Sequence, residues 1–119
     1  EDLKITGKAY RVPTRTGSIV EITAVLKQAV SADQVKDVFR KAAEKAPLKG
    51  VMGVLEDEWA SSRIVGDSLS SIIDIPLIQV MGDRLVTVAA WYDNEWGFTA
   101  RLVETAAFLV KAASPVAAK

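Results

Sequence analysis

The sequence predicts an α+β fold in which a mostly antiparallel or mixed sheet is covered by two main helices. Short runs rich in β-branched residues, bounded by Gly, Pro and Asp, indicate strands. Two longer stretches carry apolar residues every three or four positions, as amphipathic helices do. The order is strand, strand, helix, three or four strands, helix, which favours helices layered on one sheet. A chain of 119 residues is long enough for a single core.

A β-hairpin is expected at the start of the chain. Residues 3–12 are predicted to form a strand that ends at Pro13, because proline cannot donate to a strand ladder. Residues 14–17 supply turn chemistry, and residues 18–26 alternate as a second strand does. The predicted core face of this second strand consists of Val20, Ile22, Ala24 and Leu26, and its half-polar face of Ile19, Glu21, Thr23 and Val25.

The first helix is predicted to begin after Ser31. Ser31 and Gln34 have the spacing of a capping box, in which each side chain accepts a hydrogen bond from the backbone N–H of the other residue. The apolar positions between Val35 and Ala46 form one helical stripe, which we interpret as core and not as a cofactor-binding motif. Pro47 is expected to end the helix.

The second half of the chain is predicted to complete the sheet and add the second helix. Residues 51–55 and 71–73 have the character of short strands, and residues 77–81 and 85–91 flank a hairpin turn at 82–84. Residues 95–113 follow as a helix that is expected to pack on the sheet through Phe98, Leu102, Ala106, Leu109 and Ala113. Residues 114–119, with Pro115, are expected to be a flexible tail.

Composition narrows the possible functions. The chain has no Cys and no His, so the residues most often used as nucleophile and general base are missing and no metal site is expected. Its 15 basic residues balance 15 acidic ones, and no basic run interleaved with aromatics indicates a nucleic-acid partner. No segment resembles a membrane span or a signal peptide, so a cytoplasmic location is expected.

One junction has the character of a ligand site. In residues 90–101, aromatic and polar side chains crowd the point where a buried strand is predicted to meet the second helix. The motif Trp91-Tyr92-Asp93-Asn94-Glu95-Trp96-Gly97 there, with Tyr10-Arg11-Val12-Pro13-Thr14, Leu48-Lys49-Gly50 and Ser68-Leu69-Ser70-Ser71-Ile72-Ile73-Asp74, resembles the C-terminal catalytic domain of phosphorylating glyceraldehyde-3-phosphate dehydrogenases.

The resemblance implies that residues 1–113 are the C-terminal portion of a catalytic domain whose dinucleotide-binding domain is absent from this chain. In that family a cysteine forms a thioester with the aldehyde, and neither this cysteine nor the histidine that activates it is present here. The chain is therefore expected to be an N-terminally truncated piece of an enzyme and inactive alone. The implied partners are NAD or NADP, a small sugar phosphate, the rest of the enzyme and further copies, which form a tetramer in the family.

Three residues receive roles from the resemblance. Arg11 matches the arginine that binds the substrate phosphate; its alternative is a surface arginine. Asn94 matches the asparagine that holds the nicotinamide carboxamide; the alternative is a helix N-cap, and both roles can hold at once. Phe98 stands where most members have a tyrosine beside the nicotinamide; the alternative is helix core. Glu95 is interpreted as a favourable charge at the helix N-terminus.

Other interpretations remain open at this point. Because Phe98 lacks the hydroxyl, an erythrose-4-phosphate dehydrogenase relative is an alternative to a glyceraldehyde-3-phosphate dehydrogenase. A non-catalytic assembly module could use the sheet face that carries Ile19, Thr23 and Val25. A small ligand-binding domain unrelated to the dehydrogenases is a third possibility. The sequence does not distinguish NAD from NADP.

Overall fold

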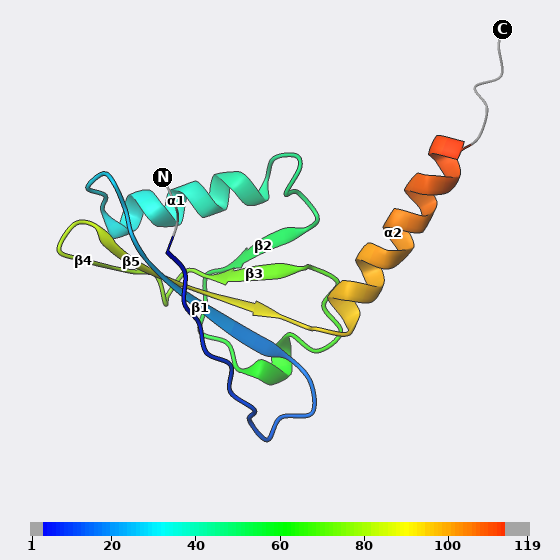
Figure 1. Cartoon of the computed structure of the whole chain (residues 1–119), viewed down its shortest axis with the longest axis horizontal. Helices are drawn as coiled ribbons and strands as arrows, with labels where there is room; N and C mark the ends of the chain where they lie inside the picture. The colour runs from blue at the N-terminus through cyan, green and yellow to red at the C-terminus, as the bar shows by residue number, and fades with distance from the viewer. Residues whose placement is uncertain (1–3, 114–119) are drawn as a thin grey trace, which may run out of the picture.

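The computed structural model describes residues 4–113 and has a five-stranded mixed sheet with two α-helices, which confirms the predicted α+β class (Figure 1). The expected tail at 114–119 lies outside the described residues. In chain order the elements are β1 (Ser18–Val25), α1 (Ala32–Ala43), β2 (Met52–Leu55), the short 3₁₀ helix η1 (Ser61–Arg63), β3 (Ser71–Asp74), β4 (Gln79–Met81), β5 (Leu85–Tyr92) and α2 (Trp96–Ala113).

Strand β5 organises the sheet, whose order is β1-β5-β3-β2, with β4 also paired to β5. It pairs antiparallel with all of β1, from Ser18 opposite Tyr92 to Val25 opposite Leu85. On its other side it pairs antiparallel with β3 and with β4, and β3 then pairs in parallel with β2. The predicted β4–β5 hairpin is confirmed, with a three-residue loop at 82–84 in which Gly82 and Asp83 have positive φ.

Helix α1 covers one face of the sheet. Its predicted capping box is present: the Ser31 hydroxyl accepts from the Gln34 N–H at 3.2 Å, and the Gln34 side chain accepts from the Ser31 N–H at 2.8 Å. The helix ends at Ala43, a few residues before Pro47. Its stripe packs on the sheet as predicted, with Val35 and Phe39 against a buried cluster that comprises Ile73, Ile75, Ile78 and Ala90.

Residues 56–70, which connect β2 to β3, supply the cover on the other face. Ile64, just after η1, is fully buried and packs with Leu55 and Ile72. Partly buried Trp59, Leu69 and Trp91 surround this second cluster. Neighbouring residues Ile72 and Ile73 thus point to opposite faces, as the period of a β-strand requires. The sheet is therefore the middle layer between α1 and this long connection.

The predicted hairpin at the start of the chain is wrong in its first half. Residues 4–17 are exposed or half-buried and contain no strand, whereas Ser18–Val25 is a strand as expected. A strand needs a partner for its ladder, and β1 forms its ladder with β5 instead. The β-branched and aromatic residues at 4–12 favour a strand locally, but within the described chain this segment pairs with no neighbouring strand, so it does not form one.

The expected core face of β1 is only partly covered. Val20 and Ile22 are 42% and 57% exposed, because α1 lies nearer to β2 and β3 than to β1. A groove of about 320 Å³ lies between α1 and β1. It is lined by Ile22, Ala24, Leu26, Val30, Gln34, Val35, Val38, Phe39, Val86 and Val88. The alternation in β1 therefore predicted which side chains share a face. It did not predict that α1 leaves part of this face uncovered.

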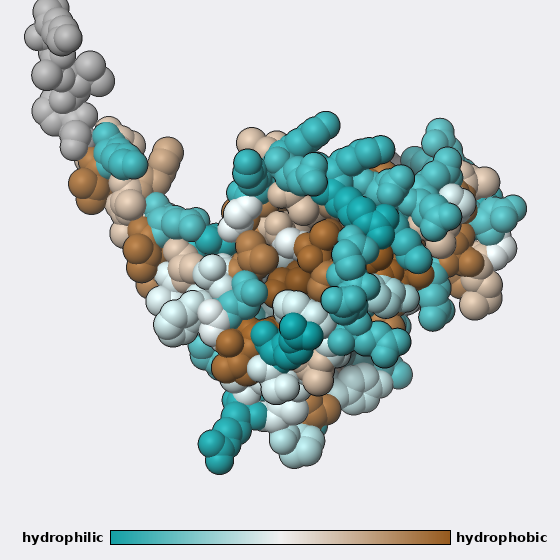
Figure 2. All heavy atoms as spheres, turned by 180° about the vertical axis from the view of Figure 1, so that it is seen from behind, coloured by the Kyte–Doolittle hydropathy of each residue, from teal (hydrophilic) through white to brown (hydrophobic). Residues whose placement is uncertain are grey.

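Helix α2 does not pack along the sheet, contrary to expectation. It leaves the end of β5 and projects away from the other elements (Figure 1). Only Gly97 in it is buried, and the predicted packing residues Phe98, Leu102 and Leu109 are 57–68% exposed. Hydrophobic side chains lie along the projecting helix between hydrophilic ones (Figure 2). The physical reason is that the helix axis points outward from its first turn, so an apolar stripe has no sheet beneath it.

No helix between residues 4 and 113 is both long and apolar enough to cross a membrane.

Replacing Ile73 by Ala is expected to lower the free energy of unfolding by about 2–5 kcal/mol, since it opens a cavity in the core beneath α1. Leu109→Ala on α2 is the matched control and should change it by less than about 0.5 kcal/mol. Urea denaturation followed by circular dichroism measures both. A large loss for Leu109→Ala would contradict the projecting position of α2.

Candidate functional site

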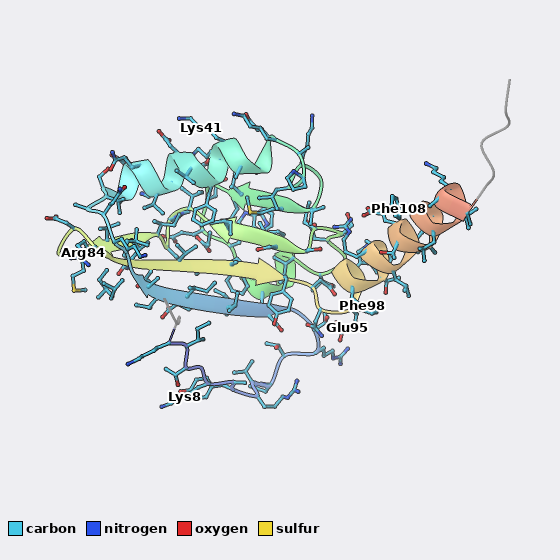
Figure 3. All side chains as sticks on the ribbon, turned by 45° about the horizontal axis from the view of Figure 1, so that its top comes forward. Lys8, Lys41, Arg84, Glu95, Phe98 and Phe108 are labelled. Carbon is cyan, nitrogen blue, oxygen red and sulfur yellow. The ribbon has the colours of Figure 1, made fainter. Side chains whose placement is uncertain are left out.

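A pocket of about 300 Å³ lies at the junction of β5 and α2, where the sequence predicted a ligand site. Its walls come from the residue before β3, from the end of β5 and from one face of the first turns of α2. Figure 3 shows Glu95 and Phe98 close together at this end of the helix. The lining residues are Ser70, Tyr92, Asp93, Asn94, Gly97, Phe98 and Arg101.

The Asp93 carboxylate fixes the junction. Its Oδ1 accepts the backbone N–H groups of Glu95 at 3.0 Å and of Trp96 at 2.7 Å. Its Oδ2 accepts the backbone N–H of Gly66 at 2.9 Å, from the connection on the outer face of the sheet. Asp93 is buried, with 4% of its surface exposed. One side chain therefore caps α2 and joins the helix start to the β2–β3 connection.

These hydrogen bonds lower the pKa of Asp93 below its ordinary value. The largest contribution comes from the Trp96 N–H, followed by the Gly66 N–H, and burial of the carboxylate opposes both. Hydrogen bonds from backbone donors stabilise the charged form of a carboxyl group, whereas loss of water destabilises it. The lowered pKa indicates that the donors dominate, so Asp93 is a structural anion and not a proton donor at neutral pH.

Asn94 is exposed, and its side chain does not make the capping bonds that the sequence allowed as an alternative; those belong to Asp93. The Asn94 Oδ1 accepts from the Ser18 hydroxyl at 3.3 Å, and its Nδ2 donates to the Glu95 carboxylate at 2.6 Å. These bonds use one of the two amide N–H groups and one of the two lone pairs. The amide can still offer one donor and one acceptor to a ligand.

Phe98 lines the same pocket and is 68% exposed. The alternative interpretation, that Phe98 is helix core, is therefore wrong for the described residues. An exposed aromatic ring beside an amide is a suitable surface for a planar heterocycle, because the ring offers apolar contact and the amide fixes orientation.

Arg11 does not line this pocket. It is exposed on the segment that precedes β1, whereas Asn94 and Phe98 share a wall. The end of that segment does reach the junction, because the Thr16 hydroxyl donates to Glu95 Oε2 at 2.6 Å. The structure thus brings two of the three expected site residues together, and places the third on a chain segment that contacts the same helix start.

Two further residues line the pocket and were given no site role from the sequence. Gly97 is needed because a Cβ there would lie 2.9 Å from the Leu69 carbonyl oxygen. Arg101 donates to Ser70 Oγ at 3.2 Å and to Glu104 at 2.6 Å, and its Nε is buried without a partner among the described atoms. The signal was available, since positions 94, 97, 98 and 101 share one helical face.

The part of the chain that the structure describes contains no cluster of three or more Asp, Glu, His or Cys residues that could hold a metal ion. The polar groups of the residues that line the pocket are an amide, two hydroxyls, a guanidinium and a carboxylate already engaged by backbone donors. This set suits binding and orientation of an organic ligand.

A family model described as the C-terminal domain of glyceraldehyde 3-phosphate dehydrogenase matches residues 1–94. The chain belongs to this family. The match confirms the resemblance found in the sequence, and residues 1–94 contain both the Arg11 segment and Asn94.

Curated relatives with the name glyceraldehyde-3-phosphate dehydrogenase agree with the family match. The protein from Kitasatospora aureofaciens is 46% identical over 104 residues, which are 87% of this chain and 31% of that protein. A cytosolic form from Craterostigma plantagineum is 42% identical over 85% of this chain and 30% of its own length. The Borreliella burgdorferi protein is 43% identical over 91% of this chain and 32% of its own length. The chain thus spans about a third of the length of these dehydrogenases.

Replacing Asp93 by Asn is expected to lower the free energy of unfolding by about 1–3 kcal/mol, because an amide has one oxygen and cannot accept from both Gly66 and Trp96. The folded pKa is lowered, so this stabilisation is complete above the unfolded pKa of about 4 and is lost as pH falls through the folded pKa. The difference between wild type and Asp93→Asn in thermal unfolding should therefore shrink below about pH 4.

The control for this prediction is Asp57→Asn, which changes an exposed carboxylate in the β2–β3 connection. It should leave the unfolding free energy nearly unchanged. A difference for Asp93→Asn that persists unchanged at low pH would contradict the assignment of Asp93 as a charged cap.

Proposed function

We propose that this chain is the nicotinamide- and phosphate-positioning part of an NAD(P)-dependent glyceraldehyde-3-phosphate dehydrogenase. The observation that carries the proposal is that Asn94 and Phe98 line one pocket while Asp93 takes over the helix cap. The Asn94 amide is thereby available for a ligand and held by a rigid helix start. Family membership supports the same assignment.

The residues of the pocket fit a nicotinamide group. Asn94 has a donor and an acceptor left for the carboxamide, and Phe98 offers an exposed ring for the heterocycle. When bound, the nicotinamide would accept hydride from the aldehyde carbon of the substrate. The contribution of this chain is to hold and orient, which lowers the barrier only when a reactive group is present.

The nucleophile has to come from outside these 119 residues, since the chain contains neither Cys nor His. The proposed reaction is oxidation and phosphorylation of an aldose phosphate through a cysteine thioester, and we expect the isolated chain to be inactive. The absence of a phenol at Phe98 keeps an erythrose 4-phosphate substrate as the alternative. The proposal includes a cytoplasmic location, which is consistent with the cytosolic relative from Craterostigma plantagineum. It does not distinguish NAD from NADP as the cofactor.

Arg11 is proposed to bind the substrate phosphate. Its guanidinium is exposed, and a planar guanidinium presents paired donors to phosphate oxygens. Its segment meets the helix start through Thr16, so phosphate and nicotinamide would be held by two neighbouring parts of one chain.

Assembly with further copies is part of the same proposal. Ile19 and Val25, on the sheet face away from α1, are 46% and 71% exposed, which supports the assembly role considered from the sequence. Sedimentation tests it, and we expect the isolated chain to self-associate. Self-association without any dehydrogenase activity when the complementary front part of the enzyme is added would favour a non-catalytic assembly module.

A chimera tests the dehydrogenase proposal. This chain would replace the matching segment of the Kitasatospora aureofaciens enzyme, and formation of reduced nicotinamide would be followed with glyceraldehyde 3-phosphate and with erythrose 4-phosphate. We expect activity in the chimera and none in the isolated chain. A folded chimera that is inactive with both substrates would contradict the proposal.

In the active chimera, Asn94→Ala is expected to raise the KM for the dinucleotide roughly two- to ten-fold, the equivalent of about 0.5–1.5 kcal/mol for a hydrogen bond. Gln79→Ala, which removes an exposed amide on β4, is the matched control and should leave this KM unchanged. Steady-state kinetics at saturating sugar phosphate measures both. An unchanged KM in Asn94→Ala would exclude the carboxamide role.

Arg11→Ala in the same chimera is expected to raise the KM for the sugar phosphate about ten-fold or more, because a hydrogen bond to a charged group is worth about 1.5–3 kcal/mol. The KM for the dinucleotide should stay the same. Arg15→Ala, four residues away on the same exposed segment, serves as the charge-matched control. Equal effects of the two substitutions would indicate a general electrostatic contribution and not a phosphate site.

A further inference from the structure

The carboxylate of Glu95 bridges two parts of the chain that are far apart in sequence. Oε1 accepts the Asn94 side-chain N–H at 2.6 Å, and Oε2 accepts the Thr16 hydroxyl at 2.6 Å. Each oxygen thus has its own donor. Favourable charge at a helix N-terminus, which was the interpretation from the sequence, requires neither of these contacts.

We propose that Glu95 is a positioning residue that orients the Asn94 amide for its ligand and fixes it relative to the segment that bears Arg11. The inference rests on the proposed function, because it assigns a role within the nicotinamide site. It adds a residue with no direct contact to the ligand, which acts through the side chain of its neighbour.

The orientation argument follows from donor and acceptor chemistry. An asparagine side chain can turn by 180° about its last bond, which exchanges its oxygen and nitrogen. Glu95 accepts only, so it requires the nitrogen on its side, which leaves the oxygen to accept from Ser18. In the reversed orientation the Asn94 oxygen would face the carboxylate. Glu95 therefore selects one of the two orientations that Asn94 could present to a carboxamide.

The contact with Thr16 extends this control to the segment before β1. Gly17 has φ of +87°, and a Cβ there would lie 3.1 Å from Ile64 Cδ1, so the chain bends closely over the core at this point. Thr16 and Ser18, on either side of the bend, contact Glu95 and Asn94 respectively. The nicotinamide subsite is therefore joined by a short run of hydrogen bonds to the end of the segment that bears Arg11, with Glu95 in the middle.

Substitutions at Glu95 separate positioning from charge. Glu95→Gln can keep both contacts, since its oxygen can accept from Asn94 while its nitrogen donates to the Thr16 oxygen. Glu95→Ala removes both. In the chimera we expect Glu95→Ala to raise the dinucleotide KM roughly two- to ten-fold, and Glu95→Gln to stay close to wild type. A helix-dipole role predicts instead that the Gln and Ala variants behave alike, and that result would overturn the proposal.

Two further variants test the route through the neighbours. Glu95→Ala combined with Asn94→Ala should raise the KM no more than Asn94→Ala alone, because both act through the same amide. Thr16→Val should raise the KM for the dinucleotide by a smaller factor than Glu95→Ala. Thr16→Ser keeps the hydroxyl that donates to Glu95, so its KM for the dinucleotide should equal that of wild type. Full additivity of Glu95→Ala and Asn94→Ala would overturn the proposal.

A readout that does not depend on activity keeps this inference separate from the proposed function. Asn94 is the sole asparagine of the chain, so its side-chain amide can be assigned by NMR in the intact 119-residue chain. We expect the two proton shifts of this amide to agree between wild type and Glu95→Gln, and the shift of the proton that faces Glu95 to move in Glu95→Ala. An inactive chimera with this NMR pattern would contradict the dehydrogenase proposal and leave the positioning role of Glu95 standing. Unchanged shifts in Glu95→Ala would contradict the positioning role of Glu95.

Discussion

The structure around the pocket depends on one buried carboxylate. Asp93 accepts three backbone N–H groups, two from the start of α2 and one from Gly66 in the β2–β3 connection. A buried charge is tolerated only when its hydrogen bonds are satisfied, and here the donors outweigh the loss of water, as the lowered pKa indicates. Without Asp93, the strand, the helix and the connection would have no shared anchor at this point.

Three consecutive polar residues at the junction have three different tasks. Asp93 holds the backbone, Asn94 lines the pocket, and Glu95 links Asn94 to Thr16. The division is possible because these three residues form the turn that leads into α2, in which successive side chains point in different directions. Neighbours in sequence therefore face the core, the pocket and the preceding segment in turn.

The sequence predicted those features that depend on local chemistry. The Ser31 and Gln34 capping box and the turn at Gly82 are determined by residues close in the chain, and both were predicted correctly. Two features that depend on distant partners were not predicted correctly. The strand expected at 4–12 has no ladder in the described chain, and the apolar stripe of α2 has no sheet beneath it.

The candidate site shows the same division. Asn94 and Phe98 were found from a motif, and the structure adds Gly97 and Arg101, which share their helical face. The cap was misplaced by one residue: Asn and Asp are about equally good caps, so composition could not choose between Asn94 and Asp93. The structure distinguishes them, because Asp93 accepts the N–H groups of Glu95 and Trp96 and also that of the distant Gly66.

The three tryptophans occupy three different environments, which gives the chain built-in optical reporters. The Trp91 indole donates to Asp74 at 2.8 Å inside the sheet, Trp59 lies under the Arg63 guanidinium at 4.6 Å, and Trp96 is 56% exposed in the first turn of α2. A water-soluble quencher would reach Trp96 first, so the accessible fraction of the fluorescence would follow the environment of the helix start without any attached dye.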